Sequence, residues 1–192
     1  MSWDPYLDLE HGVLRNRLGI TDPAELAQAE ADITLTQLAH LTLHPIEGNF
    51  DLAHLQAIHY ELFSPIYGWA GQLRTVELGK GAQRFCPPAE LRHRADRIFL
   101  GLAARDHLRG LDRAAYLDGI TELLAGLLYL HVFREGNGRS LRAMLAQLSR
   151  PAGYRLHWAD LDAQENRHAS RAAYDNDLKP LRALLDRRLS TI

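Results

Sequence analysis

The feature that most constrains this chain is its most apolar stretch, which runs from Ile120 to Phe133 and is interrupted by Glu122. A membrane-spanning helix needs roughly 20 apolar residues, so this shorter stretch predicts a buried helix of a soluble protein. The chain has 192 residues, which is enough for one domain with a sizeable core and too few for two domains of ordinary size. We therefore expect a single domain over residues 1–192.

Composition narrows the class of protein without naming a function. Hydrophobic residues make up 46% of the sequence and charged residues 24%, which is ordinary for a globular protein. The net charge of −2 gives no reason to expect nucleic acid or an anionic membrane as a partner. Cys86 is the only cysteine and cannot form an internal disulfide. The amino terminus carries Asp4, Asp8 and Glu10 and lacks the apolar core of a secretory signal. These features predict a cytoplasmic protein.

Helical patterns cover most of the chain. The first helix should begin after Asp22, because this residue can cap it, Pro23 fits the first helical position and Glu25 completes a capping box. It should end before Pro45, and a second helix should follow Asp51. Further helices are expected at about 89–104, 113–130, 138–149, 160–173 and 178–189.

One segment lacks the apolar spacing of a helix. Residues 73–78 alternate as a strand does, and a glycine-rich turn follows at 79–81. Residues 82–85 are expected to form the returning arm. A lone hairpin is marginal in water, so we expect a flap, at about residues 73–86, that lies on a helical body. The predicted fold class is mainly α, a helical bundle with one short β-hairpin flap.

The segment that carries chemistry is HVFREGNGRSLR, residues 131–142, a short loop that leads into a helix. Gly136 and Gly138 allow backbone angles denied to other residues, so successive N–H groups can converge on one point. Such a nest at a helix amino terminus is a site for phosphate. Arg139 and Arg142 in the first turn oppose the helix dipole unless a polyanion lies in front of them. Arginine also grips phosphate with a planar fork.

Two further residues of the loop complete this arrangement. The carboxylate of Glu135 is explained beside a phosphate site if a Mg²⁺ ion lies between them. The unperturbed pKa of a histidine side chain is about 6.5, so this residue type at position 131 suits a base that accepts a proton near neutrality. Phe133 should point inward and pin the loop to the core. These residues together suit the transfer of a phosphorus group to a hydroxyl.

At this point a family resemblance becomes plain. Residues 131–142 match, without a gap or substitution, the motif H-x-F-x-[D/E]-G-N-G-R-x-x-R of the Fic family. Further segments resemble that family across most of the chain. They are 12–20 (its amino-terminal stretch in small bacterial members), 58–63 with 67–74 (the helix and turn before its hairpin), 80–85 (the flap that clamps the target segment) and 165–170 (its nucleotide pocket).

The resemblance implies the fold of that family and a role for each motif residue. His131 would be the base that deprotonates the target hydroxyl, and Glu135 would hold Mg²⁺ between the α- and β-phosphates. The backbone N–H groups of Gly136, Asn137 and Gly138 would bind phosphate, and the Asn137 side chain would add a contact.

The remaining implied residues contact the nucleotide. Arg139 and Arg142 would hold the β/γ end, which leaves as pyrophosphate, and Asn166 would lie in the nucleotide pocket. The implied activity is protein adenylylation, in which AMP moves from ATP, with Mg²⁺, to a Tyr, Thr or Ser hydroxyl of a target protein. One alternative is another phosphorus transfer, in which the enzyme uses a different nucleotide or transfers phosphate or phosphocholine. A catalytically silent binding module is the other alternative, and a broken motif would indicate it.

Regulation is inferred from a missing pattern. Fic proteins are commonly restrained by the motif [S/T]-x-x-x-E-[G/N], whose glutamate pairs with the second motif arginine, here Arg142. Glu47, Glu135 and Glu165 precede Gly or Asn, and none has Ser or Thr four positions earlier. By resemblance, a separate small antitoxin protein would supply the motif, and this chain would be the toxin of the pair. Toxins of this kind resemble enzymes that modify type II topoisomerases, which makes DNA gyrase or topoisomerase IV a candidate target.

Overall fold

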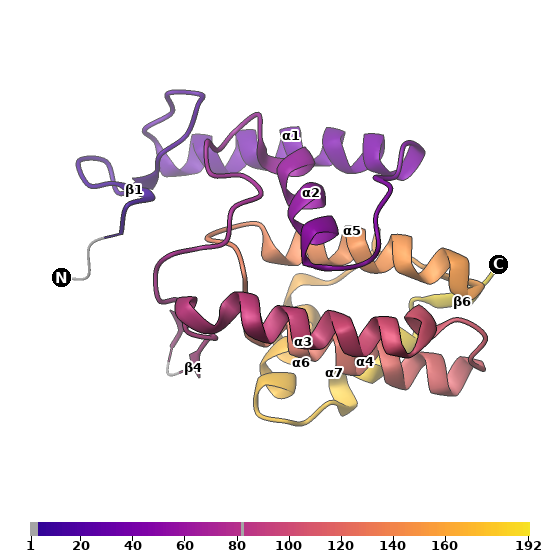
Figure 1. Ribbon diagram of the computed structural model, residues 1–192. Coiled ribbons are helices and arrows are strands. Elements are labelled where there is room, and N and C mark those ends of the chain that lie inside the picture. The colour runs from indigo at the N-terminus through magenta and orange to yellow at the C-terminus, as the bar shows by residue number, and fades with distance from the viewer. Residues whose placement is uncertain (1–3, 82) are drawn as a thin grey trace.

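The computed structural model describes residues 4–81 and 83–192, and within them it is mainly α-helical (Figure 1). The α-helices are α1 (Pro23–Leu43), α2 (Leu52–Phe63), α3 (Leu91–Ala104), α4 (Arg113–Leu130), α5 (Asn137–Ser149), α6 (Ala163–Tyr174) and α7 (Lys179–Asp186). Short antiparallel pairs join β1 (Leu7–Asp8) to β2 (Val13–Leu14), β3 (Gly79–Lys80) to β4 (Gln83–Arg84) and β5 (Tyr154–Leu156) to β6 (Leu189–Thr191). None of the described helices combines the length and apolar character that a bilayer crossing requires. The predicted fold class is confirmed.

Side-chain caps set where several helices begin. Asp22, Asp51, Asp112 and Asp162 each accept a hydrogen bond from the backbone N–H three residues further on. This satisfies one of the four N–H groups that a helix start leaves without a partner. Helices α1, α2, α4 and α6 therefore begin one residue after each aspartate. The expected start of α6 at residue 160 was too early, because Asp162 is the cap.

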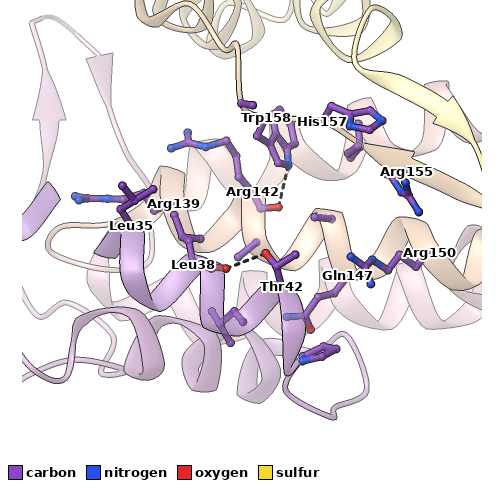
Figure 2. A pocket seen from close by; sticks show the side chains of 17 residues that line it. Leu35, Leu38, Thr42, Arg139, Arg142, Gln147, Arg150, Arg155, His157 and Trp158 are labelled. Atoms are coloured by element: carbon purple, nitrogen blue, oxygen red, sulfur yellow. Dashed lines mark hydrogen bonds between the residues drawn. The ribbon is translucent and has the colours of Figure 1, made fainter. Parts of the chain in front are cut away.

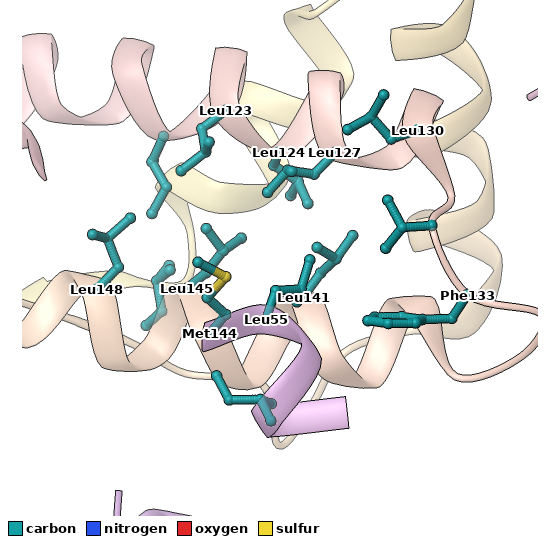
Figure 3. Close-up of a cluster of buried hydrophobic side chains, with 14 of the residues drawn as sticks. Leu55, Leu123, Leu124, Leu127, Leu130, Phe133, Leu141, Met144, Leu145 and Leu148 are labelled. Atoms are coloured by element: carbon teal, nitrogen blue, oxygen red, sulfur yellow. The ribbon is translucent and has the colours of Figure 1, made fainter. Parts of the chain in front are cut away.

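The core lies around α5. This helix packs against α2 on one side and α4 on the other, while α1 covers α2, and α3, α6 and α7 pack on α4 (Figure 1). Figure 3 shows side chains of α4 meeting those of α5, with α2 closing the other side, through Leu127, Leu130, Leu141, Leu145 and Leu55. Each fully buried leucine contributes about 1.5–3 kcal/mol. The apolar stretch that ends at Phe133 is thus the buried helix that we predicted.

The hairpin of the flap is shorter than predicted and lies later in the chain. The expected strand over residues 73–78 is irregular, and the paired strands are β3 and β4, with one further hydrogen bond from the Phe85 N–H to the Leu78 carbonyl. The physical reason is that Arg74 in this segment donates its backbone N–H to the Val132 carbonyl at 2.9 Å and not to a partner strand. Residue 82, expected to open the returning arm, lies outside the described residues.

Two other strand pairs were not expected. Strands of two or three residues carry no readable alternation, so β1 with β2 and β5 with β6 give no signal in the sequence. The expected last helix, 178–189, is shorter for a related reason. Leu189 leaves the helix and pairs with Leu156, which closes the sheet of β5 and β6.

Candidate active site

The loop between α4 and α5 has a left-handed residue at each end. His131 caps α4 with φ 46° and ψ 59°, and Gly136 caps α5 with φ 81° and ψ 1°. A Cβ atom at Gly136 would lie 2.3 Å from the Phe63 ring. Glycine is therefore required there both for the backbone angle and for the close approach.

Asn137 closes the loop from inside. Its side chain is buried, its Oδ1 accepts a hydrogen bond from the Phe133 N–H at 2.9 Å, and its Nδ2 donates to the Phe133 carbonyl at 2.8 Å. We expected this side chain to add a phosphate contact, and the structure gives it the task of holding the loop. The N–H groups of Asn137, Gly138 and Arg139 lie at the start of α5, where no preceding turn supplies an acceptor. The Gly136 N–H, which we expected in this group, donates to the Glu135 side chain instead. Such N–H groups suit an anion.

The imidazole of His131 stacks on a residue of the flap. The ring centroids of His131 and Phe85 are 4.1 Å apart with an angle of 10° between the planes. Both rings border a hollow of about 530 Å³, which is in the size range of small-molecule pockets. The flap, α4, α5 and α6 all contribute to its wall, which includes Gln83, Phe85, Tyr129, His131, Gly138, Asn166, Ser170 and Tyr174. Three of the predicted site residues therefore share one hollow.

Glu135 is the exposed carboxylate of the loop. Its side chain is 44% exposed, and its Oε1 accepts a hydrogen bond from the Gly136 N–H at 2.8 Å and lies 3.6 Å from Arg139 Nη2. In the described part of the chain, no group of three His, Cys, Asp or Glu side chains gathers that could hold a metal ion by itself. A single open carboxylate fits a hard cation such as Mg²⁺, which takes its other ligands from phosphate and water.

His59, on α2, packs against the loop and supports it, and no pattern in the sequence indicated this role. Its ring stacks on Phe133 with centroids 3.8 Å apart. Its Nδ1 accepts a hydrogen bond from the Gly71 N–H at 2.8 Å, and its Nε2 donates to the Glu135 carbonyl at 3.0 Å. Burial lowers the pKa of His59 to about 4, and the charge of Arg139 adds to that shift. His59 is therefore a neutral, buried support, which we call the strut beneath the loop, and both of its ring nitrogens are hydrogen-bonded.

The two motif arginines have different surroundings. The guanidinium of Arg139 pairs with the carboxylate of Glu30 on α1, lies 3.2 Å from the Thr34 hydroxyl, and stands 4.8 Å above the Phe63 ring. Within the described residues, Arg142 has no ion-pair partner for its guanidinium. Burial lowers the pKa of Arg142, with the charge of Arg139 as the second cause. Of the two motif arginines, Arg142 is thus the one that no carboxylate pairs with in the described structure.

Both arginines line a second hollow, which shares no lining residue with the first. It has a volume of about 820 Å³ and lies between α1 and α5 (Figure 2). Its walls are largely apolar, and cationic side chains edge it at Arg142, Arg150 and Arg155. Trp158 closes one end, where its Nε1 donates to the Arg142 carbonyl at 3.1 Å. We call this hollow the α1–α5 groove.

Tyr174 at the end of α6 ties the flap to the first hollow. Its hydroxyl accepts a hydrogen bond from the Arg84 N–H at 2.8 Å and donates to the Arg84 carbonyl. Its ring also meets the edge of Phe85, with centroids 6.4 Å apart and an angle of 88°. The flap is therefore anchored at its outer strand by a residue that lines the same hollow as His131. No pattern in the sequence singled out Tyr174.

The motif loop thus combines an imidazole, an open carboxylate and a helix amino terminus that suits an anion, and the flap stacks on the imidazole. The family model described as the Fic/DOC family matches residues 49–149, more than half of the chain. The chain belongs to the Fic/DOC family, as its sequence predicted.

Curated relatives and solved structures agree with this assignment. The protein adenylyltransferase VbhT of Bartonella schoenbuchensis is 39% identical over 189 residues, which are 98% of this chain and 40% of that protein. This chain thus spans less than half of the length of VbhT. A Sinorhizobium fredii protein, "Probable protein adenylyltransferase y4lH", is also 39% identical, and the match covers 91% of this chain and 90% of that one. The structure of an N-terminal Fic domain with bound ADP, from a Bep effector protein of Bartonella quintana, superposes with a TM-score of 0.89 at 25% identity. That match covers 97% of this chain and 94% of the other.

Proposed function

We propose that this chain is a protein adenylyltransferase, which moves AMP from ATP to a side-chain hydroxyl of a target protein. The observation that carries the proposal is the intact motif of residues 131–142, folded so that His131 and the start of α5 border one hollow. The names of the relatives and the ADP in the Bartonella quintana domain support a nucleotide as the substrate.

In the proposed reaction, His131 accepts the proton of the target hydroxyl, and the hydroxyl oxygen attacks the α-phosphorus of ATP. The bond from the α-phosphorus to the bridging oxygen breaks, and pyrophosphate leaves. The N–H groups of Asn137, Gly138 and Arg139 offset the negative charge of the phosphates. Asn166 contacts the nucleoside from α6. The hydroxyl belongs to a Tyr, Thr or Ser of the target.

Mg²⁺ neutralises phosphate charge when it is bound, and Glu135 would hold it. The polyphosphate end is assigned to Arg142, because its guanidinium has no carboxylate partner in the described structure. Arg139 is already engaged by Glu30, so its contribution to the phosphates is the smaller one. A buried free thiol at Cys86 and the use of ATP suit the cytoplasm, where we propose that the enzyme acts.

The proposed regulator is a small antitoxin protein that places an amphipathic helix in the α1–α5 groove. The groove offers the apolar walls that such a helix needs, and its cationic edge favours acidic residues on the partner. A glutamate of the motif [S/T]-x-x-x-E-[G/N] would then pair with Arg142 and exclude the polyphosphate end of ATP. The target of the toxin is proposed to be DNA gyrase or topoisomerase IV.

The test of the activity uses ATP, GTP, UTP and CTP, each labelled at the α-phosphate and incubated with the protein and a bacterial lysate. We expect label on a lysate protein from ATP only, and none from the His131→Ala variant. Label from another nucleotide, or from the γ-phosphate of ATP, would assign a different phosphorus transfer. No transfer from any donor would contradict the proposal, and full activity in excess EDTA would contradict the role of Glu135.

The test of regulation uses the isolated chain and a candidate partner bearing the inhibitory motif. We expect the isolated chain to be active and toxic when expressed alone, and the complex to be silent. Replacing the partner's glutamate by glycine should restore activity and leave the complex assembled, because one contact carries a small part of an interface. An isolated chain that is inert in a lysate that supports related enzymes would contradict this regulation.

A further inference from the structure

We propose that Arg74 is a positioning residue for this reaction, because its buried guanidinium fixes the flap and the backbone of His131 to each other. The proposal rests on the adenylyltransferase function for its activity readout and stands on geometry that is independent of it. Arg74 lies in the irregular segment before β3, where we had predicted a strand.

The guanidinium of Arg74 is held entirely by backbone carbonyls. Its Nε donates to the carbonyl of His131 at 2.7 Å, and its Nη1 to that of Val76 at 2.6 Å. Its Nη2 donates to the carbonyls of Cys86 and, at 3.1 Å, of Leu130. The residue is 2% exposed, and no ion pair joins it to a carboxylate in the described structure. Buried cations are normally paired with an anion, so this arrangement calls for an explanation.

The end of α4 supplies that explanation. Leu130 is its last residue and His131 its cap, and the final carbonyls of a helix have no partner within the helix. These carbonyls carry the negative end of the helix dipole, which favours a cation. Arg74 therefore occupies a site where four carbonyls and a helix terminus replace the missing carboxylate. Burial lowers the pKa of this guanidinium, and it stays charged because arginine begins so far above neutrality.

The carbonyls that Arg74 joins belong to the flap and to the end of α4, where the motif loop begins. Val76 and Cys86 lie on the two sides of the flap, and Cys86 is next to Phe85, on which the imidazole of His131 stacks. A left-handed backbone costs a residue other than glycine about 1–2 kcal/mol, so His131 holds its angles only if its surroundings fix them. Arg74 fixes them at the carbonyl of His131, while Phe85 holds the ring. The base and the flap then move as one body.

A purely structural role for Arg74 gives a different expectation. It would lower the melting temperature and the active fraction of the protein, while the surviving molecules would keep their normal rate and flap. The positioning role changes the rate and the flap in molecules that remain folded. Nucleotide affinity separates the two effects further, since Arg74 does not line the hollow that contains Asn166.

The experiment compares Arg74→Lys with the wild-type chain, because lysine keeps the charge and cannot reach four carbonyls. Arg182→Lys is the matched control, since Arg182 makes an exposed pair with Asp118 and lines neither hollow. We expect Arg74→Lys to bind ADP within twofold of wild type and to lose at least tenfold in the rate of AMP transfer to the lysate protein. Amide exchange at Cys86 should be at least tenfold faster in the Arg74→Lys variant, and Arg182→Lys should change none of these quantities.

A measurement on the wild-type chain covers the case in which Arg74→Lys does not fold. The amides of Arg74, Cys86 and His131 are hydrogen-bonded, to the carbonyls of Val132, Tyr129 and Leu127. If Arg74 joins the flap and the motif loop, the three amides should open in one step, with the same dependence of exchange on denaturant. Separate openings would overturn the proposal, as would a folded Arg74→Lys variant with the wild-type rate and exchange. A wild-type chain inactive with every nucleotide would overturn the proposed function, and the exchange result would still decide the role of Arg74.

Discussion

The motif loop and the flap border the same hollow, and they differ in how much of each is buried and hydrogen-bonded. In the loop, Phe133 and Asn137 are buried, and hydrogen bonds from Asn137, His59 and Arg74 hold its backbone. The flap has two strands of two residues each, and it is attached at its base by Arg74 and at its outer strand by Tyr174. Neither region has extended regular structure. The two therefore differ in the buried side chains and hydrogen bonds that hold their backbones. In the proposed reaction, the loop holds the reacting atoms in place and the flap admits a segment of the target.

The largest expected effect comes from the reacting group of the loop. His131→Ala should reduce the rate of AMP transfer by about 10³-fold, because general-base catalysis contributes about 10²–10⁴-fold. ADP binding should be unchanged, since a base acts only in the chemical step. Single-turnover transfer with labelled ATP and calorimetry with ADP measure the two quantities. A variant that keeps most of its rate would remove His131 from the mechanism.

The difference between the two regions can be measured with a matched pair of glycines. Gly136→Ala should lower the free energy of unfolding by about 3 kcal/mol, because a left-handed angle and a clash with the Phe63 ring act together. Gly81→Ala in the flap should lower it by about 1 kcal/mol. Its φ is 63°, also left-handed, but a Cβ there would meet nothing within 4 Å. Denaturant titration measures both values, and equal losses would contradict the proposed contrast.

The buried strut beneath the loop predicts a dependence of stability on pH. The pKa of His59 is lowered from 6.5 to about 4 in the folded state, so the unfolded state binds more protons between these values. Stability should therefore be full above pH 6.5 and fall as the pH drops towards 4, by about 2–3 kcal/mol from this residue. His59→Gln should lack that part of the loss. The variant and the wild type are compared by unfolding at pH 7 and pH 4.5, and parallel losses would show that His59 is not the cause.

The smallest effect is expected at the outer anchor of the flap. Tyr174→Phe removes the hydroxyl that bonds the Arg84 backbone and keeps the ring that meets Phe85. A net loss of about 1 kcal/mol would raise the KM for the protein target about fivefold, with kcat within twofold of wild type. Steady-state transfer to the identified lysate target tests this. An unchanged KM, or a loss confined to ADP affinity, would mean that this anchor does not support target binding.

The sequence predicted the helices and the motif better than the contacts that hold the site. Helices α1 and α4 were predicted with their observed bounds, because aspartate caps and apolar periodicity are local signals. The supports of the site are not local. Arg74 bonds a carbonyl 57 positions away, and Arg139 pairs with Glu30 from a distance of 109 positions. Within the sequence, Arg74 looks like one polar residue of an alternating segment. Only the folded chain shows that its side chain is buried.

The hydrogen bonds of Asn137 also affect how the protein ages chemically. Asn137 is followed by Gly138. In a flexible chain the backbone nitrogen of such a glycine readily attacks the carbon of the asparagine side-chain amide, and the amide nitrogen leaves as ammonia. Water then opens the ring that has formed and leaves a carboxylate. In the folded loop that amide is turned towards Phe133 and held at both its oxygen and its nitrogen. Folding therefore protects this bond, and each excursion to the unfolded state exposes it. A preparation stored warm or in mild denaturant should lose activity irreversibly, with a gain of one negative charge at residue 137.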